Sequence, residues 1–190
     1  MPKPDVRQEL LDAAVDHVAE HGLADLSLRR LAAELGTSHR MLSYHFGSKD
    51  GMWSAIVEEV EQRQLAAFAA LETDPMMTLE EVQRTWWRHI SDPSLWVNER
   101  LFFEVYVQAL RDRPARDEFL AGLVESWVGP SAAMAEAIGV PPERATAYAR
   151  LGLAVTRGLL LDLLATRDRA AVDAAMEEWI ALSAEFIERG

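Results

Sequence analysis

The segment that decides the fold runs from Ser27 to Lys49 and reads SLRRLAAELGTSHRMLSYHFGSK. Ser27 can cap a helix through its hydroxyl, and the apolar residues that follow recur at helical spacing. These residues are Leu28, Leu31, Ala32 and Leu35. We expect Gly36 to end this helix, because glycine enters the left-handed conformation without steric cost. The segment therefore predicts a short helix at 28–35 and then a turn.

A second short helix is expected at 38–45, directly after that turn. Thr37 and Ser38 both offer hydroxyl groups that could cap it. Its inward face is predicted to consist of Met41, Leu42 and Phe46. Two short helices joined by a glycine-containing turn form a helix-turn-helix, which places its second helix in the major groove of DNA. An ordinary helical hairpin is the alternative.

The flanking segments favour the first interpretation. Upstream, an apolar helical stripe ends at Gly22, and downstream Ser48 can cap a long helix. At motif level, the first quarter of the chain resembles the N-terminal domain of the tetracycline-repressor (TetR) family of bacterial transcription regulators. The resemblance rests on Ala13-Ala14, Glu20-His21-Gly22, Ser27 to Ala32, Leu35 to Ser38, Leu42, His45-Phe46 and Ser48-Lys49-Asp50.

Helical periodicity and a composition rich in Ala, Leu, Glu and Arg predict an all-α protein of about nine helices. The resemblance implies a DNA-binding domain at 1–48, a connecting helix at about 49–71, and an effector-binding and dimerisation domain at 49–190. It also implies a homodimer that binds an inverted-repeat operator and answers to a small-molecule effector, without a cofactor. Two positions depart from the family pattern: Ser43 stands where tyrosine usually follows the leucine, and Arg40 stands where a small residue is common. Operator preference therefore does not carry over.

Composition limits the function classes. The 190 residues include no cysteine, which excludes disulfides, thiolate catalysis and cysteine-based zinc sites. The net charge of −12 argues against sequence-independent coating of DNA, yet residues 26–50 hold four basic and two acidic side chains. The N-terminal MPKPDVRQELLDAA lacks the apolar core of a signal peptide, and no stretch is long enough to span a bilayer. We therefore expect a cytoplasmic protein.

The candidate DNA contacts lie on and beside the outward face of the second short helix. They are Ser27, Thr37, Ser38, His39, Arg40, Ser43, Tyr44, His45 and Lys49. Arg40 can give two hydrogen bonds to a guanine, although a phosphate contact is equally open to it. Lys49 joins a cation to the free amides of a helix N-terminus. The resemblance implies phosphate contacts for Tyr44 and His45. Capping alone would explain Ser27 and Thr37, and His45 could instead pack as a core residue.

An aromatic cluster between residues 79 and 130 is the candidate effector site. Core packing explains most such side chains, but apolar residues with a few polar anchors also line small-molecule sites. The candidates are Trp86, His89, Phe103, Tyr106 and Trp127, with Glu104, Arg157 and Asp162 as polar anchors. A cationic ligand would suit aromatic rings beside carboxylates.

The last two helices are the candidate dimer interface, as the resemblance implies. Their candidate residues are Leu151, Gly152, Val155, Leu159, Leu163, Met176, Trp179 and Ile180. A pair of helices packed only within one chain is the alternative. Farther upstream, Gly129-Pro130 is predicted to kink or split its helix, since proline lacks an amide donor.

No catalytic residue and no metal ligand is assigned. His17 to His21 match an H-x-x-E-H zinc-protease pattern, but no third ligand is evident, and histidine suits the end of a helix. A helical enzyme with an apolar pocket stays open as a second function, although the sequence shows no nucleophile–base pattern.

Overall fold

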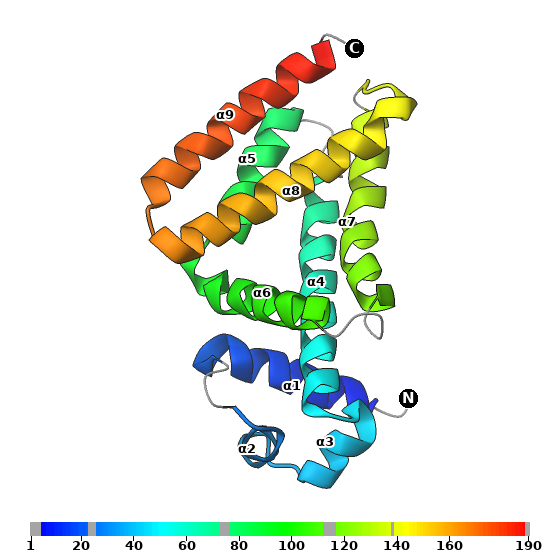
Figure 1. Cartoon of the computed structure of the whole chain (residues 1–190), viewed down its shortest axis with the longest axis vertical. Coiled ribbons are helices and arrows are strands. Elements are labelled where there is room, and N and C mark those ends of the chain that lie inside the picture. Colours follow the sequence, from blue (N-terminus) through cyan, green and yellow to red (C-terminus); the bar gives the residue numbers. More distant parts are fainter. Residues whose placement is uncertain (1–4, 23–25, 73–76, 112–116, 138, 189–190) are drawn as a thin grey trace. The chain divides into compact units, whose positions relative to one another are not determined.

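The computed structural model describes residues 5–22, 26–72, 77–111, 117–137 and 139–188, and every regular element in these ranges is helical. Figure 1 labels the helices. They are α1 (Val6–His21), α2 (Leu28–Glu34), α3 (His39–Phe46), α4 (Lys49–Glu72), α5 (Leu79–Ile90), the 3-10 turn η1 (Pro93–Leu95), α6 (Trp96–Arg111), α7 (Asp117–Ala137), α8 (Pro142–Thr166) and α9 (Arg169–Glu188). The prediction of an all-α protein with about nine helices is confirmed.

The helix contacts divide the chain into two compact units. Unit 1 comprises Met1–Gln64 and Ser94–Arg113, and unit 2 comprises Leu65–Pro93 and Pro114–Gly190. Helix α4 therefore supplies its first part to unit 1 and its last part to unit 2. Helix α6 groups with the N-terminal helices because it packs on α1. The boundary predicted after residue 48 divides a DNA-binding domain from an effector-binding domain, whereas these two units are defined by contacts. The functional boundary therefore stays a prediction.

The predicted helix caps are formed by side chains close in sequence. The Ser27 hydroxyl accepts from the Arg30 amide at 3.2 Å, and the Ser38 hydroxyl accepts from the Met41 amide at 3.1 Å. Ser38 rather than Thr37 thus caps α3. At the start of α5, Thr78 and Glu81 form the reciprocal pair of a capping box. These bonds satisfy amides that have no partner inside the helix.

Helix α7 continues through Pro130, so the predicted split is wrong, and the alternative of a kink stays a prediction. Proline removes one amide donor from the helix. The residues around it keep the helix together by packing, because Trp127, Val128 and Ala132 are all buried in the core of unit 2.

Unit 2 is a layered arrangement of helices in which α7 packs on α8, α8 on α9, and α9 on α5. A tight turn at Arg167, which has a φ of 59°, joins α8 to α9 (Figure 1). Within the described ranges, no helix combines the length and the apolar character needed to cross a bilayer.

Candidate functional site

The turn between α2 and α3 closes with two backbone hydrogen bonds. The Thr37 amide donates to the Ala32 carbonyl at 2.8 Å, and the Gly36 amide donates to the Ala33 carbonyl at 3.1 Å. This pair defines a Schellman motif, which requires a left-handed residue. Gly36 supplies it with a φ of 64°, as predicted.

Helix α3 is anchored by two side chains rather than three. Leu42 and Phe46 are buried, but Met41 is 38% exposed, so its predicted place on the inward face is wrong. One residue turns a helix by about 100°, which carries Met41 away from Leu42 and onto the ridge of Tyr44, three positions later. Tyr44 is 81% exposed. The i, i+3 spacing of these two apolar residues is the signal that would have identified the ridge.

The outward face of α3 brings several predicted DNA contacts onto one exposed surface. His39, Arg40 and Tyr44 are exposed there. Ser43 and His45 are half-buried, and the His45 ring lies edge-on to the Tyr44 ring with centroids 5.0 Å apart. The remaining candidates flank this surface: Ser27 and Ser38 are exposed and act as caps, and Thr37 is half-buried in the turn.

The first turn of α4 lies against the end of α3. Lys49 is exposed, and its Nζ lies 5.8 Å from the centre of the Trp53 ring. The Ser48 hydroxyl caps the helix by accepting from the Gly51 amide at 3.1 Å. A Cβ added at Gly51 would overlap the Phe46 carbonyl oxygen. Gly51 therefore allows the start of α4, which carries Lys49, to lie close to α3. The only sign of this role in the sequence is a glycine inside a predicted helix, where glycine lowers stability.

A charged brace ties α1 to α4 inside unit 1. The Arg63 guanidinium lies 2.6 Å from the Asp12 carboxylate and 2.9 Å from that of Glu59. Partial burial lowers the pKa of Arg63, but the hydrogen bonds and charges of Glu59 and Asp12 outweigh it and raise the pKa. Gln8 of α1 also donates to the Glu59 carboxylate, at 3.1 Å. The helix that carries Lys49 is thus held to α1.

The histidine pair of α1 forms a ring stack. The His17 and His21 rings are 4.5 Å apart between centroids, and the His21 Nδ1 lies 3.2 Å from the His17 carbonyl oxygen. Among the residues that the structure describes, no group of three histidine, cysteine or acidic side chains is suited to hold a metal.

The effector candidates fall into two groups. In unit 2, Trp86 lies 5.4 Å from both Trp127 and His89, measured between ring centroids, and the Phe68 ring joins them at 5.1 Å from Trp86. In unit 1, Phe103 and Tyr106 are half-buried, and their rings lie 5.2 and 5.5 Å from that of Phe102. Three of the five candidates thus belong to unit 2 and two belong to unit 1.

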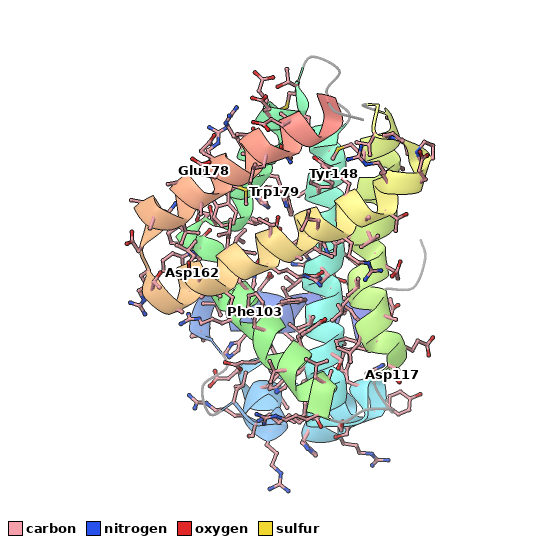
Figure 2. The ribbon with its side chains drawn as sticks, turned by 45° about the horizontal axis from the view of Figure 1, so that its top comes forward. Phe103, Asp117, Tyr148, Asp162, Glu178 and Trp179 are labelled. Carbon is pink, nitrogen blue, oxygen red and sulfur yellow. The ribbon has the colours of Figure 1, made fainter. Side chains whose placement is uncertain are left out.

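The polar anchors differ in burial. Arg157 is half-buried and donates to the Leu123 carbonyl oxygen at 2.7 Å. Glu104 and Asp162 are exposed, and Figure 2 labels Asp162 on α8. Two buried polar residues of unit 1 that are in contact with each other, Gln64 and Glu99, lie outside the predicted set.

Three of the eight dimer candidates lie on the inner face of α8 and α9. Leu163, Met176 and Ile180 are buried within unit 2, and only Leu151 is strongly exposed. Half-buried positions make up the rest: Gly152, Val155, Leu159 and Trp179. The outer face instead carries Leu161 and Leu182, which are 52% and 59% exposed and which lie outside the predicted set.

Comparison with known proteins agrees with this geometry. Residues 10–56 match the model of the bacterial regulatory proteins of the tetR family. Two BetI helix-turn-helix transcriptional regulators of Chromohalobacter salexigens are 33% and 36% identical over 64 residues, which is 32% of this chain and 32% and 31% of theirs. The match thus spans about a third of the length of these curated relatives.

Solved structures match over nearly the whole chain. The multidrug binding protein EbrR in complex with ethidium is 30% identical, with a TM-score of 0.68, over 92% of this chain and 96% of its own. A TetR transcriptional regulator from Legionella pneumophila has a TM-score of 0.73 over 96% and 99% of the two chains. At 15% identity, that second likeness shows the fold alone.

The capped α2–turn–α3 unit with its exposed ridge defines a helix-turn-helix protein. Together with the matches over the N-terminal segment and over the whole fold, it settles the family. The chain belongs to the tetR family of bacterial transcriptional regulators.

Proposed function

We propose that this protein is a dimeric repressor that binds its operator through α3 and leaves it when a small-molecule effector binds. The observation that carries the proposal is the exposed ridge of α3, on which His39, Arg40 and Tyr44 stand above a core anchored by Leu42 and Phe46. In a helix-turn-helix, this ridge enters the major groove, where polar side chains read base edges.

The outer face of α8 and α9 supports the dimer. Exposed small and apolar residues of α8 follow a three-and-four spacing: Leu151, Ala154, Gly158, Leu161 and Ala165. On α9, Ala171, Ala175 and Leu182 are exposed. Such a stripe allows close helix packing against a second copy, because its side chains are small between the leucines. We therefore propose this face as the dimer contact. Leu151 belongs both to this face and to the set of dimer residues predicted from the sequence.

Release by an effector is a shift between two populations. The two conformations of the dimer differ in the spacing of its two α3 helices. A ligand that binds one conformation more tightly raises the population of that conformation, and operator affinity falls if its α3 spacing does not match successive grooves. Linkage requires the operator to weaken ligand binding by the same factor. The complexes of EbrR with imidazole and with ethidium support a small-molecule effector.

Selection from random DNA tests the proposal. Purified protein is incubated with a library of random duplexes, and the bound fraction is sequenced after several rounds in excess unrelated DNA. We expect an inverted repeat to be enriched, because a two-fold symmetric protein mirrors its symmetry in its site. Enrichment of no sequence would reject operator binding.

A further inference from the structure

Helices α4 and α6 bury a polar pair between them in unit 1. Gln64 of α4 and Glu99 of α6 are 7% and 8% exposed, and the Gln64 Nε2 donates to the Glu99 Oε1 at 3.0 Å. Apolar residues of similar size generally fill such a position at no loss of stability, because they avoid the cost of removing a carboxylate from water. The pair therefore calls for a role other than packing.

Two buried oxygens in this region lack a donor. The Gln64 Oε1 accepts no hydrogen bond from any residue that the structure describes, and the same is true of the Oδ1 of Asn98, the residue before Glu99 on α6. Buried acceptors without a donor are rare in native proteins. What both oxygens require is an N–H or O–H group.

Aromatic rings follow Glu99 along the same stripe of α6. Phe102, Phe103 and Tyr106 stand three, four and seven positions after it, which places all four residues on one side of the helix. Figure 2 labels Phe103 on this helix, and its ring lies 5.2 Å from that of Phe102. Aromatic faces attract cations, as does a carboxylate.

We propose that Gln64, Asn98 and Glu99 bind the effector, and that this effector is an organic cation with N–H donors, such as an aromatic amidine, guanidine or amine. The inference rests on the proposed effector-controlled function. The Glu99 carboxylate pairs with the positive charge, and the ligand's N–H groups donate to the Gln64 and Asn98 side-chain oxygens. The apolar body of the ligand contacts the aromatic stripe of α6.

The position of Gln64 links this site to DNA binding. Gln64 and Lys49 lie on the same helix, fifteen residues and about 22 Å apart along its axis. The neighbouring Arg63 holds α1 through Asp12. A ligand that changes the position of Gln64 relative to α6 therefore acts on the helix that begins at the DNA-facing end of unit 1.

Three compounds with one ring system separate the contributions. 4-Phenylbenzamidine is a cation with N–H donors, biphenyl-4-carboxamide has N–H donors without the charge, and biphenyl-4-yltrimethylammonium has the charge without donors. Calorimetric titration of the intact protein should show the amidine binding at least about tenfold more tightly than either other compound, since charge-assisted hydrogen bonds are the stronger kind. Equal affinities, or no amidine binding at about 1 mM, would overturn the proposal.

Substitutions locate the site. Glu99→Gln keeps the side-chain shape and should remove the amidine's advantage over the carboxamide, whereas Glu58→Gln, at an exposed position of α4, should leave it unchanged. The double variant Gln64→Leu/Glu99→Met guards against misfolding, because replacing both partners by apolar residues should keep the melting temperature while removing amidine binding. Retained amidine preference in either the Glu99→Gln or the double variant would overturn the assignment.

An operator-binding assay with the same variants keeps the two proposals apart. If the wild-type protein binds its operator but the amidine binds equally well without Glu99, the ligand site fails and the regulator stands. If the amidine binds through Glu99 but the protein selects no DNA sequence, the regulator fails and the ligand site stands.

Discussion

Arg40 lies exposed on α3 with two roles open to it, and a substitution separates them. If Arg40 reads a guanine, Arg40→Ala should cost about 1–3 kcal/mol at the operator and relax the preference at one base position. Binding isotherms on the operator and on its single-base variants measure both effects. An unchanged base preference in Arg40→Ala would assign the side chain to phosphate or solvent.

Lys49 serves as the matched comparison, because we expect it to contact phosphate rather than a base. Lys49→Ala should weaken binding to all sequences by a similar factor and reduce the slope of affinity against salt by about one unit. A change in base preference would contradict a phosphate role.

Gly51 holds α4 against α3 because it has no side chain. Gly51→Ala places a methyl group on the Phe46 carbonyl oxygen, so the helices must separate, and we expect a loss of roughly 1–3 kcal/mol in unfolding free energy and weaker operator binding. Gly122→Ala in α7 is the control, since nothing lies near an added Cβ there, and alanine should stabilise that helix by about 0.5–1 kcal/mol. Denaturant unfolding of both variants provides the comparison, and a stable Gly51→Ala variant would show that the contact adjusts freely.

The sequence predicts individual residue contacts correctly where both partners lie within one turn of a helix. Ser27 and Ser38 cap amides three residues away, and Gly36 meets a purely local requirement for a left-handed backbone. The pairing of Gln64 with Glu99 was not readable, because 35 residues separate them and no local pattern marks a polar pair that packing brings together.

At the scale of the helices, a buried tyrosine joins α8 to its neighbours. Burial raises the pKa of Tyr148, and the polar side chains of Ser183 in α9 and Gln83 in α5 act in the opposite direction. The Tyr148 and Trp179 rings lie 6.3 Å apart between centroids, and Figure 2 labels both residues. The phenol is thus kept neutral in the folded protein.

Tyr148 should make stability fall at alkaline pH. Its folded pKa is above the unfolded value of about 10, so its contribution is complete below pH 10 and is lost as the pH rises through the folded pKa. Tyr148→Phe cannot ionise and should show a smaller decrease in unfolding free energy above pH 10. Parallel denaturant curves on either side of that pH measure the difference, and identical pH profiles for the two proteins would refute the linkage.

The outer face of α8 and α9 carries the proposed dimer contact. Leu161→Glu and Leu182→Glu each place a charge on it, so we expect each variant to sediment as a monomer, or to dimerise at least about tenfold more weakly. Leu110→Glu alters a comparably exposed leucine of α6 and should leave the dimer intact. Dimers of unchanged affinity in both interface variants would move the contact elsewhere.

Helix periodicity identified α8 and α9 but not which face of each helix points inwards. Leu163 and Leu161 are both apolar, yet the first is buried in unit 2 and the second is exposed. Met41 was misplaced on α3 for the same reason. A helix with apolar residues on more than one side allows two orientations, and only the neighbouring helices decide between them.

At the scale of the whole molecule, the net charge of −12 and the basic segment at 26–50 limit which surface can bind DNA. Acidic surfaces repel phosphate, so binding is favoured only through the basic helix-turn-helix. This charge pattern suits a protein that binds selected sites rather than one that coats DNA.

Hydroxyl-radical footprinting on the selected sequence tests specific operator binding by a dimer most directly. The proposed function requires two protected patches on one face of the duplex, related by the inverted repeat and centred about one helical turn, or a multiple of it, apart. Each patch should weaken in Arg40→Ala, and both should vanish together in a dimer-deficient Leu161→Glu variant. Uniform protection along the fragment, or a single patch with no symmetry mate, would contradict the proposed function.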